Sequence, residues 1–346
     1  MKTKSSIRNN TPSNPIKDIR VIIAFVPISI IFGAAMASII KGGVSMQAII
    51  NGGAMGFFIS AFCAIGHYTF LHRLRYIPFT AHLMLSTAYY TFVAMAVLTV
   101  KIIFFRYPHE NLAVWTRDLT ATVFLTMALS FATAFVLMLR RMLGPNVLLS
   151  FFTGRYHTPV EEERIFMFLD LVSSTTIAEK IGNLNFHVFL NDFYYDITDA
   201  ILSAKGAIYK YVGDEVIICW KTADKSNNFR CIQLFFDIIK IIESKKGKYL
   251  DRFGFIPYFR AGIHCGPVIV GEMGDYKQEI SFLGDTVNTT SRIQEACKDY
   301  KTNLLVTSEL LDRVDLPPDY KIRKYGETFL KGKEKPMTLF GIEEHS

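Results

Sequence analysis

The sequence is poor in cysteine and has no C-x-x-C pair. Its five cysteines are Cys63, Cys219, Cys231, Cys265 and Cys297. Because their spacing fits neither a metal-binding motif nor a disulfide framework, it argues against both. Isolated cysteines in apolar, strand-like or helix-like stretches are typical of reduced, mostly buried thiols in the cytosol.

Clusters of Lys and Arg with interleaved aromatic residues are also missing, although the formal net charge is +7. Proteins that bind nucleic acid concentrate their basic residues on one face or along one helix. The scattered positive charges therefore argue against a nucleic-acid partner.

Charged residues are scarce before residue 140, and four apolar stretches there contain no Asp, Glu, Lys or Arg. These stretches are 21–40, 42–66, 78–100 and 119–139. Each meets the length of about 20 residues that a helix needs to cross the hydrocarbon core of a bilayer. We therefore expect a four-helix transmembrane domain over residues 21–140, with the lipid bilayer as its partner. Without charged residues in the spans, nothing indicates a transport pathway.

The basic residues that flank these stretches predict the orientation of the protein in the membrane. They gather before the first span, between the second and third spans, and after the fourth, at Lys2, Lys4, Arg8, Lys17, Arg20, Arg73, Arg75, Arg140 and Arg141. Because cytoplasmic loops carry an excess of Lys and Arg, both termini are expected in the cytosol. The expected location is a plasma (inner) membrane, with residues 1–20 as a cytosolic tail.

Residues 141–162 join the expected membrane domain to the polar remainder of the chain. Gly144-Pro145 ends the fourth helix, and a short apolar stretch is followed by the polar run GRYHTPVEEER. Two interpretations stay open, a plain linker and a juxtamembrane element that couples the two domains.

From residue 163 onward, apolar runs of strand and helix type alternate. RIFMFLDL (164–171) predicts a buried strand, and AIYKYVG with EVIICW predicts a hairpin around Gly213-Asp214. YFRAGIHCGPVIVGEMG is expected to be a strand that passes into a glycine-rich turn. The order β-α-β-β-α-β predicts an α+β ferredoxin-like (palm-like) domain over 163–346.

Two carboxylates are expected to converge in this domain. Asp170 ends the buried strand, and Asp214 lies at the tip of the hairpin. Neighbouring carboxylates repel each other unless a cation lies between them, and Mg²⁺ accepts one or two carboxylates together with phosphate oxygens. The small residues of LVSSTT (171–176), including Ser174 and Thr175, leave backbone N–H groups free for phosphate at a helix start. This arrangement predicts a two-metal phosphoryl-transfer site.

Three motifs resemble those of class III nucleotidyl cyclases: FLDLVSST, KYVGD and GDTVNTTSRIQ. The resemblance covers roughly residues 163–341 and implies a head-to-tail homodimer with two active sites at the interface. It implies that Asp170 and Asp214, helped by the Leu171 carbonyl, hold two Mg²⁺ (or Mn²⁺) ions.

The same resemblance implies that the second subunit supplies the remaining groups. Lys210 would recognise the base, Asn288 would orient the ribose, and Arg292 would stabilise charge on the transferring phosphate. Asn288 and Arg292 are four residues apart, so they share one helix face. Lys331 would reach the terminal phosphates, with Lys333 as a nearby alternative.

The choice of base follows from the groups expected around it. Lys210 only donates hydrogen bonds, which suits N1 of adenine and conflicts with the N1–H of guanine. Ser281 stands seven residues before Asn288, where adenylyl members often carry Asp. Its hydroxyl can accept from the adenine amino group or donate to guanine O6. We therefore expect an adenylate cyclase that uses ATP.

Three alternatives stay open. The first is a guanylate cyclase, and the second is a catalytically weak cyclase-like binding module, which the intact set of motif residues disfavours. The third is a receptor whose membrane half binds an unidentified ligand or regulatory partner.

Overall fold

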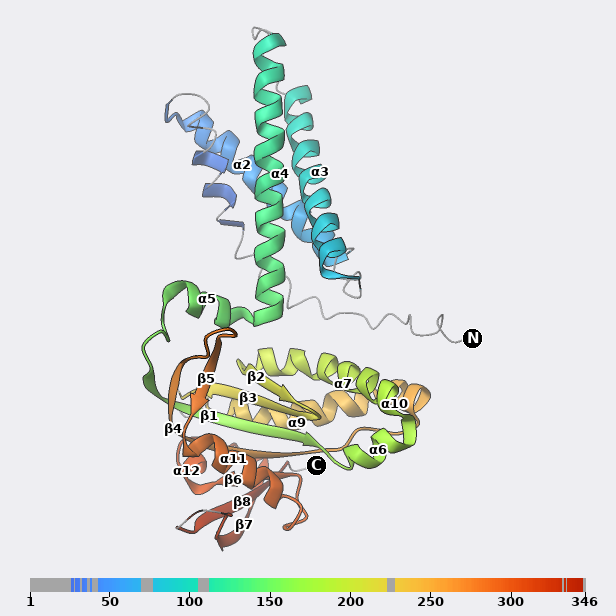
Figure 1. Ribbon diagram of the computed structural model, residues 1–346, viewed down its shortest axis with the longest axis vertical. Helices are drawn as coiled ribbons and strands as arrows, with labels where there is room; N and C mark the ends of the chain where they lie inside the picture. Colours follow the sequence, from blue (N-terminus) through green and yellow to red (C-terminus); the bar gives the residue numbers. More distant parts are fainter. Residues whose placement is uncertain are drawn as a thin grey trace. The chain divides into compact units, whose positions relative to one another are not determined.

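The computed structural model describes residues 43–69, 77–104, 112–222, 228–331 and 335–344, together with Lys333 and scattered positions between 26 and 38. The chain forms two compact units, Met1–Leu148 and Leu149–Ser346. Figure 1 shows both units.

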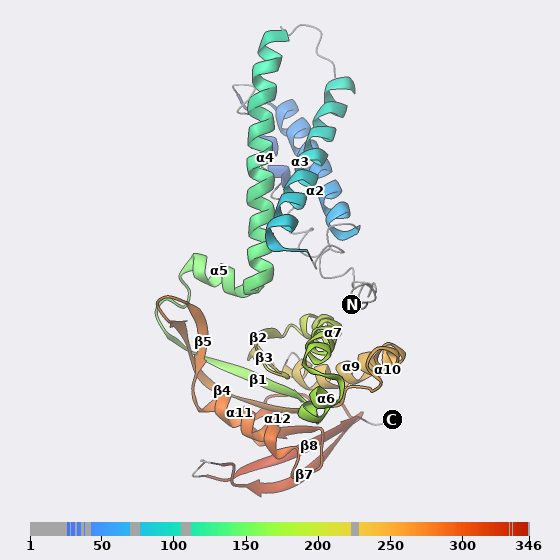
Figure 2. The same ribbon diagram turned by 45° about the vertical axis from the view of Figure 1, so that its right-hand side comes forward.

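The N-terminal unit is helical in its described part. Its helices are α2 (Met46–Thr69), α3 (Phe79–Phe104) and α4 (Leu112–Leu143). Helix α3 packs against both α2 and α4, and the Tyr89 hydroxyl on α3 donates to the Phe62 carbonyl on α2 at 2.9 Å. Figure 2 shows α3 beside the long α4.

Two stretches of the described residues, Ile49–Gly66 and Phe79–Val100, are long and apolar enough to cross a membrane. Only 22% and 28% of these windows are buried, so other parts of the protein cover little of their surface. The first predicted span lies almost wholly outside the described residues. The fourth falls within α4, where Thr126–Arg140 is a shorter apolar stretch. The four-span prediction therefore stays a prediction.

The C-terminal unit is built on an eight-stranded sheet with the order β2-β3-β1-β4-β6-β8-β7, and β5 pairs with β4 off this path. The strands are β1 (Val160–Leu171), β2 (Ala207–Val212), β3 (Glu215–Lys221), β4 (Phe259–Met273), β5 (Glu279–Leu283), β6 (Leu304–Thr307), β7 (Tyr320–Thr328) and β8 (Met337–Glu344). Only β4 and β6 pair in parallel. The central order β2-β3-β1-β4 is that of a β-α-β-β-α-β unit, so the predicted ferredoxin-like core is confirmed.

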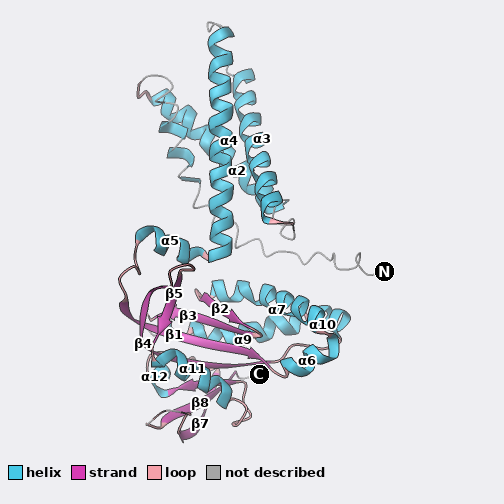
Figure 3. Ribbon diagram, in the orientation of Figure 1, coloured by secondary structure: helices cyan, strands magenta, loops and turns pink. Residues whose placement is uncertain are grey.

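Seven described helices lie wholly or partly in this unit, and Figure 3 draws them in cyan. They are α5 (Pro145–Thr153), α6 (Ser174–Ile181), α7 (Asn183–Ser203), α9 (Arg230–Ser244), α10 (Lys246–Phe253), α11 (Asp285–Ala296) and α12 (Ser308–Leu311). Because side chains alternate along β1, Met167 and Leu169 pack with α7 and α9, whereas Phe166 and Phe168 face the side covered by β5. Burial of both faces explains the unbroken apolar run of this strand.

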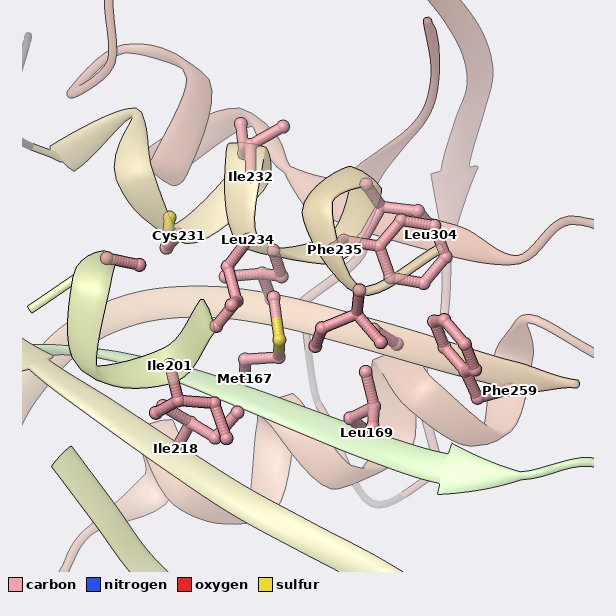
Figure 4. Close-up of a cluster of buried hydrophobic side chains, with 14 of the residues drawn as sticks. Met167, Leu169, Ile201, Ile218, Cys231, Ile232, Leu234, Phe235, Phe259 and Leu304 are labelled. Atoms are coloured by element: carbon pink, nitrogen blue, oxygen red, sulfur yellow. The ribbon is translucent and has the colours of Figure 1, made fainter. Parts of the chain in front are cut away.

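The larger core lies between the sheet and helices α7 and α9, as Figure 4 shows. Met167 and Leu169 of β1 and Ile218 of β3 are fully buried there. They meet Ile201 of α7 and Leu234 of α9. This packing fixes the end of β1, which carries Asp170.

Two boundaries differ from the sequence prediction. Strand β1 begins at Val160 rather than at 164, because Val160 already pairs with Val270 of β4. Strand β4 continues for 15 residues, so the glycine-rich turn expected within it is wrong. Gly262 lies in this strand, and a Cβ there would be 2.4 Å from the Gln294 backbone nitrogen. The glycine lets α11 approach the sheet instead of making a turn.

Candidate active site

The two predicted carboxylates lie together at one end of β1. Asp170 is the penultimate residue of β1, and Asp214 lies in the β2–β3 turn beside Gly213, whose φ is 64°. Burial and then the charge of Asp214 raise the pKa of Asp170 to about 6, against opposing hydrogen bonds from the Leu171 backbone and Gln294. The fold therefore places Asp170 and Asp214 close enough to interact, as the sequence predicted.

A third carboxylate, Glu215, belongs to the same neighbourhood. It pairs with Asp170 in the β1–β3 register. Its pKa is raised to about 7, mainly by burial and then by the negative charges of Asp170, Asp214 and Glu295. The sequence contains this signal as the adjacent acidic residues Asp214 and Glu215, but only Asp214 was predicted to belong to the site.

The donor set suits a hard divalent cation. Within the described ranges, no three His, Cys, Asp or Glu side chains form a ready metal cluster. Asp170 and Asp214 instead offer two carboxylates, and the Leu171 carbonyl is adjacent. Mg²⁺ is commonly held by one or two carboxylates and completed by substrate phosphates and water, so these residues fit it.

Ser174 and Thr175 are the first two residues of α6. The N–H groups of the first helical turn have no acceptor within the helix, so they are free to bind an anion. Ser173 precedes them in the left-handed region, with φ 60° and ψ 31°. A non-glycine residue seldom adopts this conformation, and here it turns the chain from β1 into α6.

Three of the other predicted residues share one cavity. Asn288 and Arg292 of α11 and Lys331 line a cavity of about 250 Å³, together with Ser291 and Glu295. Lys333 instead forms an ion pair with Asp285 at the start of α11. The structure therefore brings Lys331, rather than Lys333, to Asn288 and Arg292.

The predicted base-recognition residues lie on β2 and β5. The Lys210 ammonium is 2.8 Å from Glu279 Oε1, and this hydrogen bond raises the pKa of Lys210 and lowers that of Glu279. Ser281 lies on the same strand as Glu279 and is only 8% exposed. Its hydroxyl is 3.4 Å from that of Tyr209. Glu279 was not predicted, because nothing in the sequence shows which β5 residue faces Lys210.

Two further polar residues near Asp170 were missed. Gln294 of α11 donates to Asp170 Oδ2 at 3.4 Å. Arg260 pairs with Asp170 in the β1–β4 register, and its buried Nε has no hydrogen-bond partner among the residues that the structure describes. A buried donor without a partner is costly, so it is available to a ligand. The signal for Arg260 was a charge inside the apolar run YFRAGIHC.

The predicted site residues lie at three places in one chain: the Asp170–Asp214 end of β1, the cavity on α11, and Lys210 beside β5. In the part of the chain that the structure describes, no hydrogen bond or ion pair joins Asp170 or Asp214 to Lys210, Asn288 or Arg292.

Comparison with known proteins gives a family match. Residues 158–343 match the family described as the adenylate and guanylate cyclase catalytic domain. Adenylate cyclase 2 of Rhizobium meliloti (strain 1021) is 36% identical over 208 residues, which cover 60% of this chain and 57% of the relative. Adenylate cyclase of Anabaena cylindrica is 24% identical over 51% of this chain and 36% of the relative. Human retinal guanylyl cyclase 1 is 28% identical over 59% of this chain and 18% of the relative.

A solved structure shows the same fold. A bacterial light-regulated adenylyl cyclase superposes with a TM-score of 0.56 at 20% identity, covering 64% of this chain and 65% of that one. The chain spans between about a fifth and somewhat more than half of the length of the curated relatives named above.

Proposed function

Because the chain belongs to the adenylate and guanylate cyclase catalytic domain family, we propose that it converts ATP to 3′,5′-cyclic AMP and pyrophosphate. The observation that carries this proposal is the Asp170–Asp214 pair at one end of β1, where burial and then the charge of Asp214 raise the pKa of Asp170. Such a pair is suited to a divalent cation and a polyphosphate substrate.

In this proposal Asp170, Asp214 and the Leu171 carbonyl hold two Mg²⁺ or Mn²⁺ ions. When bound, the ions supply positive charge that favours ionisation of the ribose 3′-OH and departure of pyrophosphate. The free N–H groups at Ser174 and Thr175 bind phosphate oxygens. Arg260, which pairs with Asp170 in the β1–β4 register, would add a positive charge beside these phosphates.

The cavity on α11 supplies the groups that orient the substrate. Arg292 donates its guanidinium to the phosphate on which charge develops, and Asn288 positions the ribose through its amide. Lys331, in the same cavity, binds the terminal phosphates. These groups hold the 3′-OH in line with the phosphorus, which is the main way in which a protein accelerates phosphoryl transfer.

We propose that two chains share each site as a head-to-tail homodimer. Among the described residues, no hydrogen bond or ion pair joins Asp170 or Asp214 to Lys210, Asn288 or Arg292 of the same chain, so a second chain would supply these three residues across an interface. One subunit supplies Asp170 and Asp214, and the other supplies the rest.

ATP is the proposed substrate because Lys210 only donates hydrogen bonds, which fits N1 of adenine. The relative that shares 36% identity is named an adenylate cyclase, which supports this choice. Guanylate cyclase is the second candidate, since human retinal guanylyl cyclase 1 is 28% identical.

We further propose that residues 21–140 form four membrane spans, that both termini and the catalytic domain are cytosolic, and that residues 141–162 connect the two parts. The two long apolar helices α2 and α3 support this topology. A membrane ligand or regulatory partner would act through these spans.

Product analysis tests the activity. Full-length protein is given ATP or GTP separately with Mg²⁺ or Mn²⁺, and the products are identified. We expect cyclic AMP from ATP. A protein that makes no cyclic nucleotide from either substrate contradicts the proposal.

Complementation tests the shared site. Asp214→Ala and Asn288→Ala are each expected to be inactive, and their mixture is expected to recover up to about a quarter of wild-type activity. In a heterodimer both defects fall in one site and leave the other intact. The matched control mixes Asp214→Ala with Asp170→Ala, which damage the same group and should give no recovery. Recovery in both mixtures, or in neither, argues against the shared site.

A further inference from the structure

Strand β5 presents two polar side chains next to Lys210. Glu279 and Ser281 are two residues apart on β5, so they lie on the same face of the strand. The β2–β3 register shifts between Ile208 and Lys210. At this irregularity, both Tyr209 and Lys210 reach β5 side chains.

The two β5 side chains differ in access. Ser281 is 8% exposed, and its hydroxyl lies 3.4 Å from the Tyr209 hydroxyl, which also accepts a hydrogen bond from the Phe282 backbone N–H. The Tyr209 ring packs edge-on against Phe282, with centroids 4.8 Å apart. Ser281 is therefore held within the packing of β5 under Tyr209.

Glu279 is open to solvent beside Lys210. The side chains of Lys210 and Glu279 are 38% and 37% exposed, and their charged atoms are 2.8 Å apart. A base that arrives from solvent meets this donor and this acceptor before it meets the covered hydroxyl of Ser281.

We propose that Glu279, rather than Ser281, completes the base-recognition pair with Lys210, and that the pair selects adenine. This inference rests on the proposed cyclase function and deepens it. The Lys210 ammonium donates to N1 of adenine, and the Glu279 carboxylate accepts from the adjacent 6-amino group. Neighbouring acceptor and donor atoms on the base match the neighbouring donor and acceptor atoms of the ion pair.

The same placement rejects guanine. Guanine presents N1–H to the Lys210 donor and O6 to the Glu279 acceptor, so both contacts become unfavourable. A base that leaves two polar groups unpaired is discriminated against far more strongly than one that lacks an apolar contact. The ion pair also holds both side chains near their binding geometry before the base arrives.

A purely structural role for Glu279 predicts a different outcome. Ion pairs this exposed contribute about 0–1 kcal/mol to stability, and their loss does not alter the choice between two substrates. The ratio of kcat/KM for ATP to kcat/KM for GTP therefore separates the two roles.

The decisive variant is Glu279→Gln in the full-length protein, which preserves side-chain size at an exposed position. We expect kcat/KM for ATP to fall at least about tenfold, mainly through KM, because the charged acceptor is replaced by a neutral amide that accepts more weakly and can also turn its NH2 toward the base. GTP use should not fall, so the ATP/GTP ratio should drop by at least about tenfold. The matched control is Glu327→Gln on β7, an exposed glutamate that should leave the ratio unchanged.

Ser281→Ala provides the comparison between the two candidates. It should change the ATP/GTP ratio less than Glu279→Gln does. A larger change with Ser281→Ala, or an unchanged ratio with Glu279→Gln, overturns the inference. Selective loss of GTP use in Glu279→Gln also overturns it, because the pair would then recognise guanine.

Nucleotide binding separates this inference from the proposed function. If the wild-type protein forms no cyclic nucleotide, the proposed function fails, yet the affinities for ATP and GTP are still measurable. Tighter binding of ATP than of GTP that is lost in Glu279→Gln supports the inference. Equal effects on both nucleotides contradict it.

Discussion

Gln294 links helix α11 to the end of β1 that carries Asp170, since its Nε2 donates to Asp170 Oδ2 at 3.4 Å. Gln294 is buried, and the hydrogen bond acts to lower the pKa of Asp170. Helix α11 also carries Asn288 and Arg292. The helix that we propose to orient the substrate therefore also contacts a carboxylate of the proposed metal site in the same chain.

Substitution of this amide should weaken metal binding. In Gln294→Leu the Asp170 carboxylate loses a donor that favours its charged form, so its pKa should rise further. We expect the Mg²⁺ concentration for half-maximal activity to increase by about three- to tenfold. This is the size of effect expected when one long hydrogen bond to a charged group is lost. Mg²⁺ titrations of cyclase activity measure it.

The Gln294→Glu variant sharpens that test. It keeps the size of the side chain and adds a negative charge beside Asp170. Its effect should exceed that of Gln294→Leu at neutral pH. An unchanged Mg²⁺ requirement in both variants means that Gln294 does not act on Asp170.

Asp170→Asn should stabilise the metal-free protein while abolishing its activity. The folded pKa of Asp170, about 6, lies above its ordinary value of 3.8, so its contribution to stability is lost as the pH rises through this window. Asn resembles the protonated form and removes the repulsion from Asp214. At pH 7.5 without metal, the Tm of the variant should exceed that of the wild type.

Mg²⁺ supplies the control for that comparison. It should raise the Tm of the wild type more than that of Asp170→Asn, because the ion binds the folded carboxylate pair. If the variant has a lower Tm without metal, repulsion between Asp170 and Asp214 is not a strain on the fold.

His264 should make the catalytic unit acid-sensitive. It is buried and shares a 2.9 Å hydrogen bond with Thr307. Burial is the main cause that lowers its pKa from 6.5 to about 4. The charges of Lys333 and Arg313 also lower the pKa, whereas those of Glu309 and Asp285 raise it. Between pH 6.5 and 4 the unfolded chain binds the proton and the folded chain does not, so stability falls as the pH falls. The loss is at most about 3 kcal/mol.

Urea unfolding at pH 7 and pH 5, followed by the fluorescence of the buried Trp220, measures this effect. His264→Gln keeps a polar group near Thr307 and cannot titrate, so it should lose less stability between the two pH values. An equal loss in both proteins assigns the acid sensitivity to other groups.

Tyr209→Phe should loosen the base pocket more than the fold. The hydroxyl accepts from the Phe282 N–H and contacts Ser281, and its removal leaves these buried groups without a partner. We expect a loss of about 1–2 kcal/mol in unfolding free energy. KM for ATP should rise with a smaller change in kcat, because Lys210 is the adjacent residue. An unchanged KM would show that the pocket does not depend on this contact.

The sequence was sufficient for the carboxylate pair and for much of the fold. A continuous apolar run that ends in Asp170 and a glycine-aspartate hairpin have few alternative structures, and both formed as expected. Periodicity did not predict the length of β4, because Gly262 and Gly266 allow close packing with α11 rather than a turn.

The residue on β5 that pairs with Lys210 could not be predicted from the sequence. Which β5 side chain faces Lys210 depends on the irregular register of β2 near Tyr209, and no local pattern marks it. The choice between Lys331 and Lys333 likewise depends on where a loop passes, not on residue type. The hydropathy of the first 140 residues predicts spans from composition alone, and the described helices bear on only part of that prediction.

Strand β4 gives the catalytic unit a stiff mechanical axis. Near one end, its Glu272 N–H donates to the carbonyl of Tyr156, a residue just ahead of β1, and at the other end it carries Arg260. Twelve residues of strand, about 40 Å, separate these points, and β1 pairs with β4 along nearly the whole distance. β1 holds β4 along this length, and β5 and β6 pair with it near its two ends. We therefore expect a displacement of the segment before β1 to reach Arg260 through these paired strands.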